Sequence, residues 1–85
     1  MNISKHEQRV LHELALGGAI HYERCDKGKI REITCFTREG HVLTDCPLDL
    51  FQRLRRRRFI RSQNGRPYRV TRLGITSVRA QLNQR

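Results

Sequence analysis

The chain has 85 residues, a formal net charge of +10 and three cysteines, and 36% of its residues are hydrophobic. This length supports a modest core, so we expect residues 1–85 to form a single domain. No stretch could span a membrane, and the charged start "MNISKHEQRV" is unlike a secretory signal. These features exclude a membrane-spanning protein and predict a cytoplasmic one without a membrane partner.

The positive charge is confined to the second half of the chain. Residues 1–46 hold seven Lys and Arg against seven Asp and Glu, whereas residues 47–85 hold eleven Arg against Asp49 alone. Such asymmetry within a small domain indicates that the partner is a polyanion or an acidic protein surface. It says nothing about the fold.

The first half is predicted to form a helix followed by a β-meander. Ser4 and Glu7 have the spacing of a capping box, an apolar stripe follows, and Gly17-Gly18 ends the segment, which predicts a helix over 5–16. Strands are predicted over 19–25, 29–36 and 41–44, separated by the turns Asp26-Lys27-Gly28 and Arg38-Glu39-Gly40. The register of these strands stays open, because no single pairing matches every apolar residue.

A second helix is predicted to open at Asp45-Cys46-Pro47, with the proline in the first turn and Asp45 or Cys46 as the N-cap. Its expected buried face is the apolar set Leu48, Leu50, Phe51 and Leu54. Continuing the helix would place Arg58 in the middle of that face, where an unpaired guanidinium would be costly. We therefore expect the helix to end at about 56–57 and Arg58 to lie in a turn.

A β-hairpin and a last helix complete the predicted fold. Asn64-Gly65 is typical of a type I′ turn. Counting outward from it pairs Gln63 with Arg66, Ser62 with Pro67, Arg61 with Tyr68 and Phe59 with Val70. Thr71 should cap the last helix, whose apolar residues are Ile75, Val78 and Leu82.

The predicted order is helix, antiparallel β-meander, helix, β-hairpin wing and helix. This is an α+β fold of winged-helix type, in which a meander replaces the helix that normally precedes the helix carrying the basic face. The match to a winged helix is therefore partial.

The candidate binding surface consists of arginines on the second helix and the hairpin. Helical periodicity directs Arg53 and Arg56 away from the apolar face and Arg57 to one side. Four more arginines lie on or beside the wing: Arg61, Arg66, Arg69 and Arg72. Such a surface offers contacts to phosphates along a duplex, without a mixture of side chains for reading bases.

The alternative for these arginines is an ordinary solvated face. Basic residues in the last turn of a helix interact favourably with its dipole, by about 0.3–1 kcal/mol each. That effect accounts for a few arginines and not for the whole set, so we favour a binding surface.

Catalytic and metal sites are not expected. The cysteines at 25, 35 and 46 match neither a disulfide framework nor a zinc pattern, and the histidines lack the spacing of a helical metal site. No residue is marked as an activated nucleophile, and there is no phosphate-binding glycine loop. We expect a protein that is not an enzyme and has no cofactor.

Several segments together resemble the YjhX toxin family of small bacterial proteins: "MNISKHEQRVLHELALGG", "CFTREG", "DC" at 45–46, "RFIRSQNGRPYRV" and "VRAQLNQR". The resemblance covers essentially the whole chain in the same order. It implies a toxin of a toxin–antitoxin pair that inhibits bacterial DNA topoisomerase I, neutralised by an antitoxin with an acetyltransferase-like fold. It supplies no active residues.

Two functions of other classes stay open beside this one. The chain could be a winged-helix DNA-binding transcriptional regulator or nucleoid-associated protein, or a structural subunit whose basic face meets only a protein. DNA and DNA topoisomerase I are thus the two candidate targets of the arginine surface.

Overall fold

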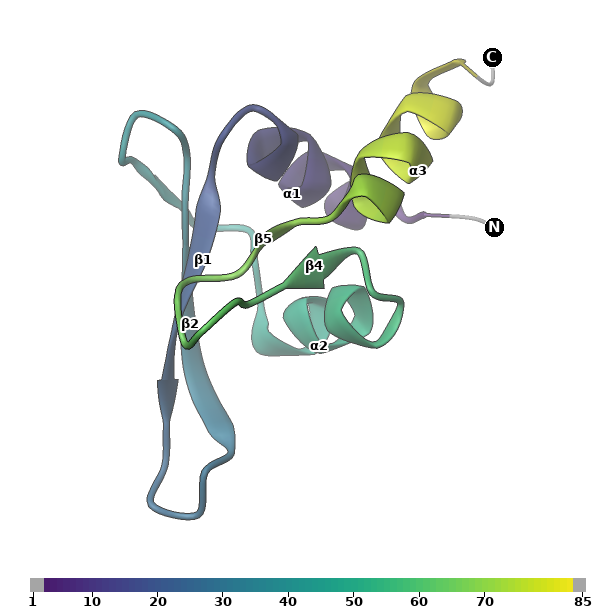
Figure 1. Cartoon of the computed structure of the whole chain (residues 1–85). Coiled ribbons are helices and arrows are strands. Elements are labelled where there is room, and N and C mark those ends of the chain that lie inside the picture. The colour runs from purple at the N-terminus through teal and green to yellow at the C-terminus, as the bar shows by residue number, and fades with distance from the viewer. Residues whose placement is uncertain (1–2, 84–85) are drawn as a thin grey trace.

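A computed structural model describes residues 3–83, with side chains described as far as residue 80. Over this range the chain forms three helices and two small antiparallel sheets, which confirms the α+β class. The elements are α1 (Lys5–Ala15), β1 (Ala19–Arg24), β2 (Ile30–Phe36), β3 (Val42–Leu43), α2 (Leu48–Arg56), β4 (Ile60–Arg61), β5 (Arg69–Val70) and α3 (Arg72–Asn83). In Figure 1 the long β1–β2 hairpin stands along one side, and β4 and β5 lie between α2 and the pair formed by α1 and α3.

The predicted capping box at the start of α1 is confirmed. Ser4 Oγ accepts a hydrogen bond from the Glu7 N–H at 3.1 Å, and Glu7 Oε1 accepts one from the Ser4 N–H at 3.4 Å. The helix ends at Ala15, one residue earlier than predicted. Beyond it, a Cβ on Gly18 would lie 2.5 Å from the Phe36 carbonyl oxygen, so the chain leaving α1 passes directly against β2.

The meander is also confirmed, and its register is now defined. The first sheet has the order β1-β2-β3, with Ala19 opposite Phe36 and Phe36 opposite Val42. The β1–β2 ladder shifts between Glu23 and Arg24, which places Ile30 opposite Arg24. The glycines of both predicted turns, Gly28 and Gly40, have positive φ of 81° and 90°.

The start of α2 differs from the prediction. Pro47 itself is the N-cap, with an extended backbone (φ −70°, ψ 161°) and no capping side chain. Asp45 does not cap, because its carboxylate accepts a hydrogen bond from Arg9 Nη1 at 3.3 Å, and Cys46 packs against the core instead. Leu48, expected in the buried face, remains exposed on the first turn.

The end of α2 follows the prediction. The last helical residue is Arg56, Arg57 is the C-cap, and Arg58 has a φ of 62°. A left-handed residue at this place ends the helix and turns the chain toward β4. Leu50, Phe51 and Leu54 are buried as expected.

The hairpin turn is confirmed, whereas the predicted strand register is wrong. Asn64 and Gly65 both have positive φ, as a type I′ turn requires, and the Arg66 N–H donates to the Gln63 carbonyl at 3.0 Å. Beyond the turn the pairs are Ile60–Val70 and Arg61–Arg69, one residue away from the predicted ones.

Pro67 and Tyr68 account for this shift. The Ser62 hydroxyl, not a backbone N–H, donates to the Arg66 carbonyl, and Pro67 has no N–H with which to continue the ladder. Tyr68 then pairs with β1: its N–H donates to the Ile20 carbonyl at 2.8 Å, and the Ile20 N–H donates to the Tyr68 carbonyl at 2.9 Å. The returning strand therefore bridges the second half of the chain to the first sheet.

Thr71 caps α3 as predicted, since its Oγ1 accepts the Gly74 N–H at 3.1 Å. Val78 is buried and Ile75 half-buried, while the side chain of Leu82 lies outside the described residues. A Cβ on Gly74 would lie 2.5 Å from the Phe59 carbonyl oxygen, so α3 begins in direct contact with the residue before β4.

The core joins both halves of the chain. Val10, Leu11 and Ile20 from the first half form one buried cluster with Phe51 and Tyr68 from the second. The Tyr68 ring meets the Phe51 ring edge-on, with centroids 5.0 Å apart. Tyr68 is therefore a core residue that also orients the hairpin.

Candidate functional site

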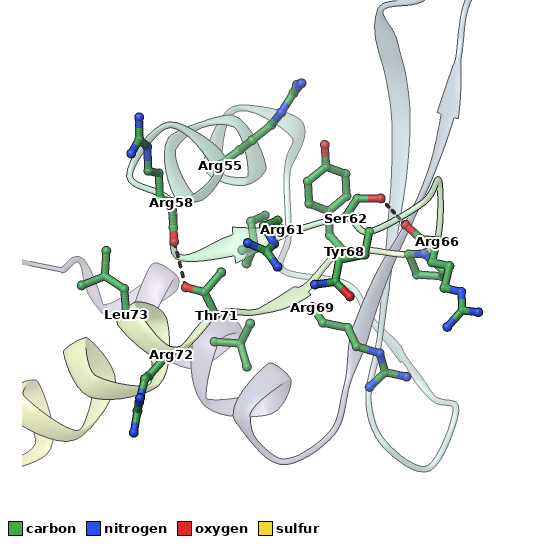
Figure 2. A pocket seen from close by; sticks show the side chains of 14 residues that line it. Arg55, Arg58, Arg61, Ser62, Arg66, Tyr68, Arg69, Thr71, Arg72 and Leu73 are labelled. Carbon is green, nitrogen blue, oxygen red and sulfur yellow. Dashed lines mark hydrogen bonds between the residues drawn. The ribbon is translucent and has the colours of Figure 1, made fainter.

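An open groove runs between the end of α2, the β4–β5 hairpin and the start of α3. It has a volume of about 920 Å³ and is lined by fourteen residues (Figure 2). Six of them are arginines: Arg55, Arg58, Arg61, Arg66, Arg69 and Arg72. None of the described residues that line it is acidic, so we name this feature the arginine groove.

Hydrogen bonds at the arginine groove connect its walls to each other and to the first sheet. Thr71 Oγ1 donates to the Arg58 carbonyl at 2.8 Å and thereby ties the end of α2 to the start of α3. Ser62 Oγ lies 3.4 Å from the hydroxyl of Tyr22 on β1, and this hydrogen bond lowers the pKa of Tyr22. The left-handed turn at Arg58 and the capping residue Thr71 thus both shape the groove.

The guanidinium groups spread around the rim and do not converge on one point. In Figure 2, Arg55 and Arg58 extend from the α2 side, Arg66 and Arg69 from the hairpin, and Arg72 from α3. Such a distribution suits an extended anion with many charges better than a single small one. A single phosphate would be bound by donors that meet around it.

The structure divides the seven arginines predicted as a binding surface. It brings Arg61, Arg66, Arg69 and Arg72 together in the arginine groove. Arg53 and Arg56 are exposed on α2, as expected, but do not line it.

Arg57, predicted as part of the binding surface, is instead half-buried against the rest of the protein. Its Nη1 lies 3.3 Å from Glu7 Oε2, its side chain is 25% exposed, and its guanidinium carbon lies 5.0 Å from the centre of the Phe59 ring. The carboxylate that it meets belongs to a residue of another helix, fifty positions away, which helical periodicity could not reveal.

Arg55 and Arg58 are members of the groove that sequence reasoning missed. Arg58 was expected to act only through its backbone, yet its exposed side chain lines the groove. Arg55 is held by two neighbours: it donates to Gln52 Oε1 at 3.4 Å, and its guanidinium carbon lies 5.9 Å from the centre of the Tyr68 ring. For Arg55 the sequence carried no signal, because its place in the groove depends on how the hairpin folds back.

The three thiols lie away from the arginine groove. Cys35 is buried, and Cys25 and Cys46 are half-buried. A hydrogen bond with Cys46 lowers the pKa of the Cys35 thiol, whereas the same contact and burial raise that of Cys46. At the tip of the β1–β2 hairpin, backbone N–H groups of Lys27 and Lys29 lower the pKa of Cys25.

Within residues 3–83, no three His, Cys, Asp or Glu side chains come together as a metal site would require. None of the helices formed by that part of the chain is long and apolar enough to span a membrane.

Comparison with known proteins identifies the family. A family described as "Putative toxin of bacterial toxin-antitoxin pair", the YjhX toxin family, matches residues 1–85. The chain belongs to the YjhX toxin family. This confirms the resemblance carried by the sequence segments and implies an antitoxin as partner.

Three relatives match this chain over its whole length and over their own. UPF0386 proteins of Parvibaculum lavamentivorans, Aliivibrio fischeri and Ruegeria sp. (strain TM1040) are 60%, 58% and 56% identical to this chain over 85 residues, with full coverage of both chains in each case. No solved structure matches this fold.

Proposed function

We propose that this YjhX-family chain is a non-catalytic toxin that inhibits bacterial DNA topoisomerase I by binding polyanions through the arginine groove. The observation that carries the proposal is that six arginines line one groove. None of the described residues in its lining is acidic. Inhibition of the topoisomerase would block relaxation of supercoils and so stop growth. The antitoxin, with an acetyltransferase-like fold, would prevent this.

The charge of the protein limits how inhibition can work. A protein with a net charge of +10 does not imitate DNA in the binding cleft of an enzyme, because such a mimic must be acidic. The toxin instead covers the DNA substrate or binds an acidic surface of the topoisomerase. Arginines spread along a rim favour the DNA, whose phosphates repeat along an extended backbone.

A second candidate, a DNA-binding regulator, is favoured by the order of the elements. The basic helix α2 is followed directly by the β4–β5 hairpin, and the hairpin carries Arg61, Arg66 and Arg69. This order resembles the helix and wing of winged-helix proteins. A regulator would prefer one DNA sequence and keep that preference at raised salt, whereas a protein that coats phosphates would lose affinity steeply without sequence preference.

The test is a supercoil-relaxation assay with purified DNA topoisomerase I and increasing DNA at a fixed concentration of this protein. If the toxin covers DNA, excess DNA should relieve the inhibition, and DNA-independent inhibition would instead indicate docking on the enzyme. A variant with Arg61, Arg69 and Arg72 changed to Ala should lose most of the inhibition. Its matched control changes the exposed Arg24, Arg31 and Arg38 to Ala, with the same loss of charge. Equal inhibition by both variants would refute the arginine groove as the site.

A further inference from the structure

The arginine groove also contains apolar side chains that a phosphate backbone does not need. Ile60, Pro67, Val70 and Leu73 line it together with the arginines. Leu73, in the first turn of α3, is 50% exposed although it is a large aliphatic residue. Figure 2 shows its side chain on the groove beside the Arg58–Thr71 hydrogen bond.

Contact between phosphates and the apolar residues of the groove is energetically unfavourable. Covering Leu73 with a charged sugar–phosphate backbone would desolvate the phosphates without an apolar contact in return. A peptide with both acidic and apolar side chains satisfies both parts of the groove, because its carboxylates pair with the rim while its apolar side chains cover Leu73 and Val70. The lining therefore fits an acidic amphipathic peptide more completely than it fits DNA.

We infer that the arginine groove is the docking site of the antitoxin, which inserts an acidic segment with interspersed apolar residues. Two observations carry this inference: the rim of six arginines with no acid among the described lining residues, and the exposed Leu73 in the same groove. Family membership supplies the existence of an antitoxin. The antitoxin would neutralise the toxin by occupying the arginines that the polyanion needs, and this last step rests on the proposed function.

Synthetic peptides can test the chemistry directly. One peptide of about twelve residues alternates Glu with Leu, and a matched peptide has Ser in place of each Leu, so both carry the same charge. Fluorescence anisotropy at physiological salt measures the affinity of each for the intact protein. We expect the Glu–Leu peptide to bind about tenfold more tightly than the Glu–Ser peptide.

Leu73→Gln is the decisive variant, and Leu16→Gln is its matched control. Leu16 has a similar exposure, 53%, but lies after α1 and outside the groove. Leu73→Gln should remove the preference for the Glu–Leu peptide, whereas Leu16→Gln should keep it. Equal affinity for the two peptides, or a preference that survives Leu73→Gln, would show that the groove recognises charge alone and would overturn the inference.

Two further measurements connect the groove to the antitoxin and separate this inference from the proposed function. In a pull-down with its antitoxin, the Leu73→Gln protein should capture less antitoxin than the Leu16→Gln protein; equal capture by both would overturn the inference. A single-stranded DNA oligonucleotide should displace the Glu–Leu peptide, and simultaneous binding of both would place them at different sites. Failure of the relaxation assay would refute the proposed function and leave the peptide result standing.

Discussion

Arg57 Nη1 lies 3.3 Å from Glu7 Oε2 and joins the end of α2 to the first turn of α1. The Glu7 side chain is only 6% exposed, and its carboxylate also accepts the Ser4 N–H in the capping box. A single carboxylate therefore caps one helix and neutralises an arginine at the end of another.

Changing Arg57 to Ala should lower the free energy of unfolding by about 2 kcal/mol, because it leaves the carboxylate of Glu7 buried without its cation. Arg53→Ala, an exposed position on the same helix, should change it by less than about 0.5 kcal/mol. Urea denaturation of both variants measures the difference. Equal stability of the two would show that the ion pair contributes nothing.

Because the backbone at Arg58 is left-handed, two substitutions that both remove the guanidinium should differ in stability. Glycine adopts a φ of 62° without a steric penalty, whereas alanine does not. Arg58→Ala should therefore be less stable than Arg58→Gly by about 1 kcal/mol. Denaturant midpoints of the two variants decide this, and a more stable alanine variant would contradict the left-handed turn.

Gly74 should not tolerate a side chain, because a Cβ there would lie 2.5 Å from the Phe59 carbonyl oxygen. That carbonyl accepts the Thr71 N–H at 2.8 Å, so its displacement would weaken the pairing of β4 and β5. Gly74→Ala should lower the unfolding free energy by about 2 kcal/mol and speed hydrogen exchange at the Thr71 amide.

Gly40→Ala serves as the control for Gly74→Ala. A Cβ at Gly40 meets no atom within 4 Å, and only the positive φ of 90° opposes it. It should leave exchange at Thr71 unchanged, and faster exchange in both variants would indicate a general loss of stability.

The sequence predicted those parts of the fold that depend on nearby residues. The capping box of Ser4 and Glu7, the glycine turns and the helix end before Arg58 all follow from interactions a few positions apart. The hairpin register could not be predicted, because it depends on Tyr68 pairing with Ile20 in a distant strand. The same limit applies to Arg57, whose partner Glu7 is remote in the sequence.

The candidate site was predicted only in part for a related reason. The basic character of the hairpin was evident from Arg61, Arg66 and Arg69. Whether Arg55 or Arg53 lies beside them depends on where the hairpin meets α2, and this contact is set by tertiary packing. Composition thus predicts the charge of a surface, and the fold decides which charges act together.

The groove arginines should contribute more to DNA binding than the exposed arginines of α2. Removing one phosphate-binding arginine reduces the slope of log affinity against log salt by about 0.9 for duplex DNA. Arg61→Ala with Arg69→Ala should therefore reduce the slope by about 2, and Arg53→Ala with Arg56→Ala by less. Filter binding across a salt series measures both slopes. A larger change in slope for the Arg53 and Arg56 variant would indicate that DNA contacts the outer face of α2 instead.

Thiol alkylation should follow the order of exposure and pKa. The pKa of Cys25 lies below its ordinary value of 9.0 because backbone N–H groups of Lys27 and Lys29 stabilise the thiolate. Its alkylation rate should rise with pH and reach half its maximum below pH 9, and Cys25 should react before the buried Cys35 and before Cys46, whose pKa is raised. Peptide mapping after timed iodoacetamide treatment gives the three rates. Modification of Cys46 before Cys25 would contradict the lowered pKa of Cys25 and the raised pKa of Cys46.

The bridge between Tyr68 and Ile20 has a consequence for any attempt to divide this protein. The charge of the chain changes abruptly near residue 46, which makes that place an obvious point at which to cut out the basic part. Yet Tyr68 hydrogen-bonds to β1 and packs in a cluster with Val10 and Leu11 of α1. A fragment of residues 47–85 would therefore be a polycation without a stable core. Any DNA binding by the fragment would reflect an unfolded basic peptide and would say nothing about the intact protein.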